Sequence, residues 1–258
     1  MRGFFTSYEN ANQRFTQSQS WNAIHGFSEI AVARDNYSIF SIADSHIGSS
    51  KNFGKFIQEA MDMNALAVIL NGDITNGNEK DYEKLTDILS PIESLNYFMI
   101  AGNHDLYFNG WVHFRARFGT AAYYFTVKTP RFFDLFICLD TGGGTLGDLQ
   151  LRWFKNLLES MRNDYRYCVV FTHNNILRHR ATMSTNLMLE EIRVFVDLLV
   201  RHKINYVVTG HDHIRNVDVL GNTTFLVMDA AFDDFKRASY LKMDFGGEKL
   251  KYEFIPFP

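Results

Sequence analysis

From residue 37 onward, short apolar runs alternate with longer segments whose apolar residues recur at helical spacing. Apolar runs bounded by turn residues are typical of buried strands, and the periodic segments are typical of amphipathic helices. A regular alternation of the two predicts parallel strands joined by right-handed crossovers. We therefore expect strands and helices in turn at residues 37–43, 52–63, 67–70, 79–89, 97–101 and 111–118.

The second half of the chain mixes two kinds of connection. Gly221-Asn222 and Gly246-Gly247 each separate two short runs that read as strands, which is typical of hairpin turns. Helices are predicted at residues 148–161 and 187–202. Further strands are expected at residues 122–127, 132–139, 167–171, 206–209, 217–220, 223–228, 239–245 and 249–255. These patterns predict two packed, mostly mixed sheets with helices on the outside.

Residues 1–36 differ from the rest because they are polar and rich in Gln, Ser and Asn. Phe15, Trp21 and Phe27 are scattered through this segment, and such aromatic content argues against a disordered tail. We expect an N-terminal arm at 1–36 that packs these rings onto a single domain at 37–258.

Composition allows one sizeable core, since 46% of the 258 residues are hydrophobic. The formal net charge of −3 argues against nucleic acid as a partner, because duplex binding draws on many Lys and Arg contacts to phosphates. Cys138 and Cys168 both lie in apolar, strand-like runs, so we expect buried free thiols.

No apolar stretch approaches the length of a membrane span. Residues 1–10 contain no apolar core of a signal peptide. Taken at face value, the chain is expected to be cytoplasmic, although an exported protein whose signal had been removed would look the same.

Five short polar motifs follow five of the predicted strands. Ligands of α/β sheets collect outside the carboxyl ends of the strands, so these motifs are expected to meet at one rim. The motifs are Asp44-Ser45-His46, Gly72-Asp73, Gly102-Asn103-His104-Asp105, Thr172-His173 and Gly210-His211-Asp212-His213.

Carboxylate, imidazole and amide oxygen together form a ligand set that suits two divalent metals such as Mn, Fe, Zn or Co. Two cations close together repel one another unless a carboxylate bridges them, and Asp73 is the expected bridge. The remaining ligands are expected to be Asp44, His46 and His213 for one metal, and Asn103, His173 and His211 for the other.

This metal pair predicts hydrolysis of a phosphoester in a small organophosphate. A hydroxide bridging both metals would be available near neutral pH and would attack phosphorus in line. His104 is the candidate for holding a phosphoryl oxygen or protonating the leaving oxygen. Asp105, the second candidate catalytic residue, or a nearby carboxylate is expected to orient the His104 ring.

The five motifs, in this order, resemble those of the calcineurin-like metallophosphoesterase family. The resemblance covers the chain from about Asp44 to His213. It implies a four-layer αββα sandwich of the α/β (α+β) class, a dinuclear phosphatase or phosphodiesterase, and the same ligand assignment. Two positions depart from the pattern: Asn76 replaces the tyrosine of purple acid phosphatases, and Asn174-Asn175 replaces a proline that follows the lone histidine in many relatives.

Several weaker signals stay open. Arg178, His179 and Arg180 form a basic patch that is either a solvated loop or a clamp for substrate phosphate, so Arg178 and Arg180 join Asn103 and His104 as candidate substrate contacts. The substrate, the choice between monoester and diester, the metals and the oligomeric state are not defined by the sequence. The alternatives to a phosphoesterase are a scaffold protein of the same fold that barely catalyses, and a nuclease.

Overall fold

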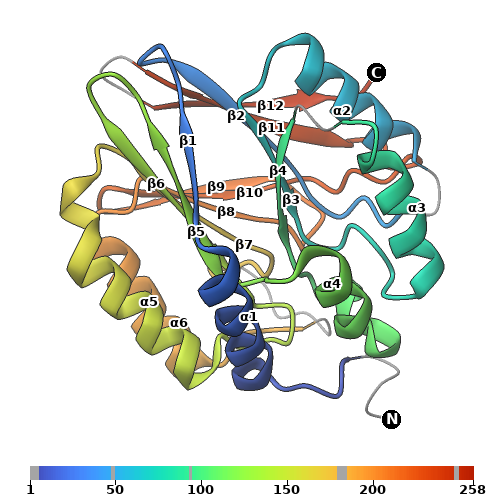
Figure 1. Cartoon of the computed structure of the whole chain (residues 1–258), viewed down its shortest axis with the longest axis horizontal. Helices are drawn as coiled ribbons and strands as arrows, with labels where there is room; N and C mark the ends of the chain where they lie inside the picture. The colour runs from blue at the N-terminus through green and yellow to red at the C-terminus, as the bar shows by residue number, and fades with distance from the viewer. Residues whose placement is uncertain (1–5, 48–49, 93–94, 179–184, 247–249) are drawn as a thin grey trace.

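The computed structural model describes residues 6–47, 50–92, 95–178, 185–246 and 250–258. Two mixed β-sheets pack face to face and helices cover their outer faces (Figure 1). The smaller sheet has the order β12-β11-β2-β3-β4, in which β2, β3 and β4 run parallel and β11 is antiparallel to both β2 and β12. Its strands are β2 (Tyr37–Ile42), β3 (Ala67–Asn71), β4 (Asn96–Ile100), β11 (Ser239–Phe245) and β12 (Lys251–Pro256).

The larger sheet has the order β1-β5-β6-β7-β8-β10-β9. Its central strands β6, β7, β8 and β10 are parallel, and hairpins add β5 and β9 in the antiparallel sense. The hairpin predicted at Gly221-Asn222 is confirmed, because Leu220 pairs with Thr223. The strands of the larger sheet are β1 (Ser28–Ala31), β5 (Tyr123–Lys128), β6 (Phe133–Leu139), β7 (Cys168–Thr172), β8 (Tyr206–Thr209), β9 (Asn216–Leu220) and β10 (Thr223–Val227).

Three hydrophobic layers hold the sandwich together. One lies between the two sheets, a second between the smaller sheet and helices α2 to α4, and a third between the larger sheet and helices α5 and α6. This arrangement confirms the predicted αββα architecture. The helices are α1 (Ala11–His25), α2 (Lys51–Asp62), α3 (Glu79–Leu89), α4 (Trp111–Phe118), α5 (Gly147–Met161) and α6 (Leu189–Arg201), with 3₁₀ turns η1 (His104–Asn109) and η2 (Arg162–Asp164).

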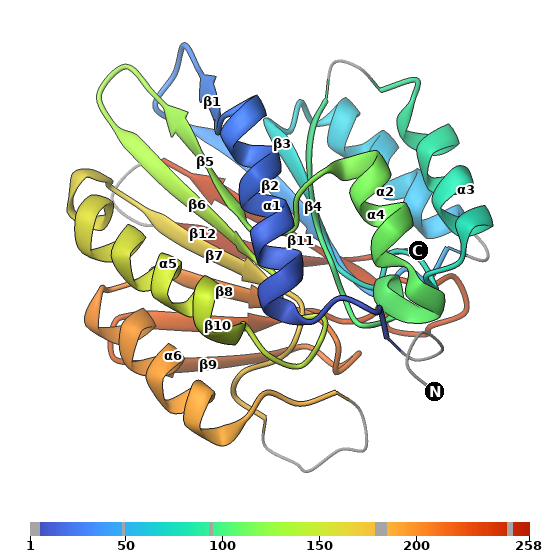
Figure 2. The same cartoon turned by 60° about the horizontal axis from the view of Figure 1, so that its bottom comes forward.

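The N-terminal segment holds regular structure that the sequence pattern did not indicate. Helix α1 lies between α5 and α4, and β1 pairs in parallel with β5 (Figure 2). The face that α1 buries includes Arg14, Ser18 and Asn22, so it carries no apolar stripe to reveal the helix. The available signal was local, because Asn10 and Gln13 form a capping box at the helix start.

Of the three aromatic side chains expected to pack onto the domain, Phe15 is buried and contacts Trp153, whereas Trp21 and Phe27 stay partly exposed. Arg14 fastens α1 to the loop after β6 through an ion pair with Asp140, with 2.7 Å between Nε and Oδ2. The division of the chain at residue 36 stays a prediction, although β1 is an integral strand of the larger sheet.

Cys138 and Cys168 are free and buried, as expected. Burial raises the pKa of each thiol to about 12, so both are protonated near neutral pH. Within the described ranges, none of the helices is both long and apolar enough to cross a bilayer.

Candidate metal centre

The seven predicted metal ligands lie in loops at the carboxyl ends of five strands. Strands β2, β3 and β4 of the smaller sheet lead into Asp44 and His46, Asp73, and Asn103 respectively. Strands β7 and β8 of the larger sheet lead into His173, and into His211 and His213. The site therefore lies where the ends of the two sheets meet, and loops distant in sequence can share it.

Six of the seven residues, joined by His104, form three overlapping clusters. Within each cluster, one ligand atom per residue lies within 4.8 Å of the others. Asp44, His46 and His213 form the first, which corresponds to one predicted shell. Asp73, His173 and His211 form another, which corresponds to the second shell without its asparagine, and His46, Asp73 and His104 link the two.

The carboxylates lie at the centre of this arrangement. His173 Nε2 is 3.1 Å from Asp73 Oδ2 and 3.8 Å from Asp44 Oδ1, and His213 Nε2 is 3.2 Å from the same oxygen of Asp44. The second oxygen of each carboxylate is held by the backbone. Asp44 Oδ2 accepts a hydrogen bond from His211 N (2.9 Å), and Asp73 Oδ1 accepts one from His104 N (2.7 Å).

Four buried polar atoms of the site form no hydrogen bond of normal geometry within the described parts of the chain, and the contacts of Asp44 Oδ1 and His173 Nε2 are ion-pair contacts with other predicted ligands. An unsatisfied buried donor or acceptor costs about 1–3 kcal/mol, so four in one place call for a ligand. They comprise carboxylate, imidazole and amide atoms, the donor set that fits a pair of divalent cations. The four atoms are Asp44 Oδ1, His46 Nδ1, Asn103 Oδ1 and His173 Nε2.

Backbone strain is concentrated in the same loops. Left-handed φ angles are uncommon for residues other than glycine and cluster at functional sites. Five of the predicted ligands have them: Asp44 (53°), His46 (43°), Asp73 (51°), His211 (71°) and His213 (58°).

Glycines in three of the motifs make room for these side chains. A Cβ on Gly72 would lie 2.4 Å from His173 Nδ1. A Cβ on Gly102 would lie 2.2 Å from Asp73 Oδ1, and one on Gly210 would lie 2.5 Å from Asp44 Oδ2. The glycine in each motif thus has a steric reason, because any larger residue would displace a predicted ligand.

Burial and neighbouring charges shift the pKa values in opposite directions. Burial opposes ionisation of His173, but the charges of Asp73 and Asp44 outweigh it and raise its pKa to about 10. Burial also raises the pKa of Asp73, yet the nearby charge of His173 brings the net value below the usual range. Burial and the charge of His173 lower the pKa of His211 to about 4. The cluster therefore holds both carboxylates ionised and His211 neutral at pH 7.

Backbone carbonyls orient two of the imidazoles, a feature that sequence reasoning missed. His173 Nδ1 lies 3.0 Å from the carbonyl oxygen of Asn71, and His211 Nε2 lies 2.9 Å from that of Thr185. Such partners fix the tautomer and orientation of metal-binding histidines. No side-chain pattern signals them, because any residue supplies a carbonyl.

Asp105 has a different neighbour from the one expected. Its Oδ1 accepts hydrogen bonds from Thr75 N and Thr75 Oγ1, both at 2.8 Å, and its Oδ2 accepts one from Gly102 N at 2.9 Å. Burial and the charge of Asp73 raise its pKa to about 7. The carboxyl group thus ties together the loops that carry Asp73 and Asn103, rather than contacting the His104 ring.

Arg178 also has structural partners. Its guanidinium forms an ion pair with Asp212 at 2.6 Å, and it contacts the carbonyl of Thr185 and the side chain of Asn186. It therefore fastens the segment around Thr185 to the loop of His211 and His213, and the expected contact with substrate phosphate stays a prediction. Arg180 and His179 lie outside the described residues.

Comparison with known proteins identifies the class. The calcineurin-like phosphoesterase family matches residues 37–215, and the chain belongs to this family. The structure is similar to a dimetal phosphatase from Danio rerio, with a TM-score of 0.68 and 11% identity over 85% of this chain and 96% of that one. It is also similar to GAP50, the anchor in the inner membrane complex of Plasmodium, with a TM-score of 0.64 and 11% identity over 86% and 85% of the two chains.

At such low identity these structures show a shared fold, and no curated protein matches the sequence. The chain is thus a metallophosphoesterase-fold protein with a cluster of aspartate and histidine side chains suited to metal binding.

Proposed function

We propose that the protein is a dinuclear, metal-dependent phosphoesterase that acts on a small organophosphate. The observation that carries this proposal is the set of four orphaned, buried ligand atoms at Asp44, His46, Asn103 and His173. A scaffold with no bound ion would bear the cost of these atoms and of the strained loops for no gain.

The residues divide into two shells around a shared carboxylate. Asp44, His46 and His213 would hold one cation. Asn103, His173 and His211 would hold the other cation. Asp73 would serve both cations, because its Oδ1 accepts a hydrogen bond from His104 N while its Oδ2 stays available for metal binding. When bound, such a pair supplies Lewis-acid stabilisation of a phosphoester and a water acidic enough to attack it near neutral pH.

We assign contact with the substrate to His104, and its position beside His46 supports this role. Its ring centroid is 4.5 Å from that of His46, and the side chain is partly exposed. Burial lowers its pKa, so the ring is neutral at pH 7. A neutral imidazole donates a hydrogen bond to a phosphoryl oxygen well, and this role fits better than proton donation to the leaving group.

The test is an assay of the purified chain with Mn²⁺ on an aryl phosphate and on a bis-aryl phosphate. Asn103→Ala and His213→Ala each remove one ligand from a different shell, so both should lose activity. Undiminished turnover in both variants would refute the site.

The scaffold alternative has one observation in its favour, the similarity in fold to the Plasmodium anchor GAP50. Catalysis is favoured here because every predicted ligand side chain is present and those in the three clusters converge. Metal analysis separates the two: a chain that holds less than one metal ion and cannot be loaded is a scaffold. A nuclease is disfavoured by the net charge of −3.

A further inference from the structure

One phenylalanine ring lies beside the imidazoles of the metal centre and a second phenylalanine contacts it, and no motif predicted either residue. The ring of Phe232 has its centroid 5.8 Å from that of His213 and 6.3 Å from that of His46. Phe235 lies next to Phe232, with 5.1 Å between the centroids of the two rings. Both are partly exposed, so the pair adds accessible apolar surface next to the predicted ligands His213 and His46.

The segment that carries Phe232 is fixed to the ligand loops. Ala231 N donates hydrogen bonds to the carbonyls of Ala43 and Asp44, at 3.2 and 3.1 Å. Asn52 Nδ2 donates to the carbonyl of Ala231 at 3.2 Å, and Asp233 accepts from Asn52 N at 2.8 Å. The backbone on both sides of Phe232 is therefore fixed to the start of α2 and to the loop of Asp44.

A partly exposed phenyl ring costs free energy in water and adds nothing to binding a phosphate alone. Beside the metal centre it would stabilise an organic group attached to phosphorus, because such a group would lie next to the residues proposed to hold the phosphoryl oxygens. Aromatic pairs prefer tilted or offset contacts, and Phe232 packs against His213 in such a contact, with 65° between the two ring planes.

We propose that Phe232 is a specificity-determining residue that selects phosphoesters with a planar, apolar ester group, such as an aryl ester. The inference rests on the proposed function, since it assumes that phosphate is held by the metal centre. Phe232 contacts the ester group that is retained during the reaction and takes no part in bond cleavage.

Two diesters with the same leaving group test this selection. Bis(4-nitrophenyl) phosphate and methyl 4-nitrophenyl phosphate both release 4-nitrophenolate, and they differ in the ester group that remains. Phe232→Ala should lower the ratio of their kcat/KM values by about tenfold, chiefly through KM for the bis-aryl ester. Phe232→Tyr should keep most of the ratio, because it retains the ring.

The matched control is Phe133→Ala, which removes a more exposed phenyl ring (41% exposed) from the start of β6. It should leave the ratio unchanged. The metal content of each variant, measured by mass spectrometry, should equal that of the wild type, so that a change in the ratio reflects contact with the ester group.

A binding measurement decides the inference without turnover. Phenylphosphonate should bind the Mn²⁺-loaded chain about tenfold more tightly than methylphosphonate, and Phe232→Ala should abolish this preference. If the wild type hydrolyses neither these diesters nor the aryl phosphate, the proposed function fails; if it hydrolyses the aryl phosphate alone, the proposed function stands. In both cases the phosphonates decide the role of Phe232. If the diesters are hydrolysed but Phe232→Ala changes neither the kcat/KM ratio nor the phosphonate preference, the selection is refuted and the proposed function stands.

Discussion

The metal centre and the junction between α1 and the rest of the molecule both bury polar groups, but these groups are hydrogen-bonded or ion-paired far more completely at the junction. At the junction, polar side chains are paired: Arg14 with Asp140, Trp111 Nε1 with Gln17, and Asn22 with the carbonyl of Ala122. At the metal centre, buried carboxylate, imidazole and amide atoms form no hydrogen bond of normal geometry with any described residue.

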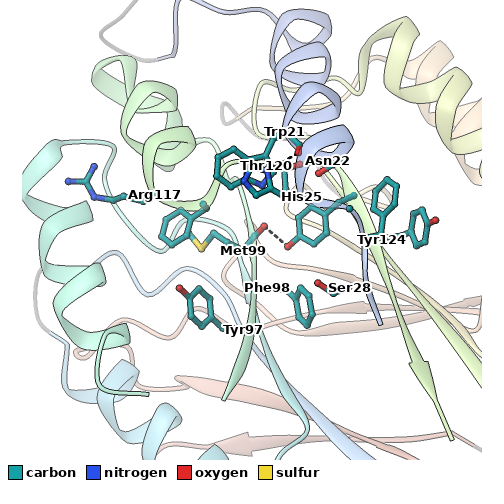
Figure 3. A pocket seen from close by; sticks show the side chains of 14 residues that line it. Trp21, Asn22, His25, Ser28, Tyr97, Phe98, Met99, Arg117, Thr120 and Tyr124 are labelled. Carbon is teal, nitrogen blue, oxygen red and sulfur yellow. Dashed lines mark hydrogen bonds between the residues drawn. The ribbon is translucent and has the colours of Figure 1, made fainter. Parts of the chain in front are cut away.

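The cavity beside this junction illustrates the difference. A hollow of about 320 Å³ lies between the end of α1, the edge strand β4 and the start of β5 (Figure 3). Its walls contact one another, since Trp21 stacks on His25 and the hydroxyl of Tyr123 donates to the carbonyl of Met99. Concavity alone is therefore a poor guide to function in this molecule, whereas unpaired buried ligand atoms are a good one.

The largest effect is expected when the ion pair between Arg14 and Asp140 at the α1 junction is removed. Arg14→Met leaves Asp140 as an unpaired buried charge and should lower the free energy of unfolding by about 3–5 kcal/mol. Arg201→Met is the matched control, because Arg201 pairs with Asp197 on the surface of α6, and it should cost about 0.5 kcal/mol or less. Urea denaturation measures both, and equal losses would contradict the account of the junction.

The next effect concerns the shared carboxylate of the metal centre. Asp73→Asn keeps the shape of the side chain but removes its charge, so it should lower activity by at least about 100-fold, more than is typical of residues that only support a ligand. Asp87→Asn, on the exposed face of α3, is the control and should leave activity unchanged. Steady-state assays at saturating Mn²⁺ check this, and wild-type rates for Asp73→Asn would exclude it as the bridge.

A smaller loss should follow when the shape of a ligand loop changes. A Cβ at Gly102 would meet Asp73 Oδ1 and must displace it, so Gly102→Ala should lower activity by about 10- to 100-fold. Gly54→Ala is its counterpart on α2, where no atom lies within 4 Å, and it should stabilise the protein by about 0.5–1 kcal/mol with unchanged activity. Equal activities in the two variants would show that Gly102 has no steric role.

The smallest effect concerns the two buried cysteines, one in the hydrophobic layer between the sheets and one in the layer under α5 and α6. Because burial raises the pKa of Cys138 and Cys168 to about 12, both thiols should resist a thiol reagent at pH 8. Their raised pKa also means that stability falls as pH rises from the unfolded value toward 12, since only the unfolded state then ionises freely. Reaction in the native state at the rate of the urea-unfolded chain would contradict the burial.

Much of this molecule follows from local patterns in the sequence. Strands such as β3 and β7 are buried along their whole length, so they appear as uninterrupted apolar runs. The metal motifs follow such runs, and the geometry of a parallel sheet brings them together. Order and position therefore sufficed to predict the clusters.

Other features depend on contacts that no local pattern records. Helix α1 buries a polar face, so hydrophobic periodicity could not reveal it. Asp105 lies next to His104 in sequence, yet its carboxyl group points to Thr75 and Gly102. Phe232 follows β10 in an ordinary-looking segment, and only the fold places its ring beside His213.

The most direct test of the account is the metal stoichiometry of the full chain after loading with Mn²⁺ and removal of free ions. Two ions per chain in the wild type, with the loss of at least one in Asp73→Asn, is the result expected of paired shells around a shared carboxylate. Less than one ion per chain in a folded and fully loaded wild type would contradict the central claim.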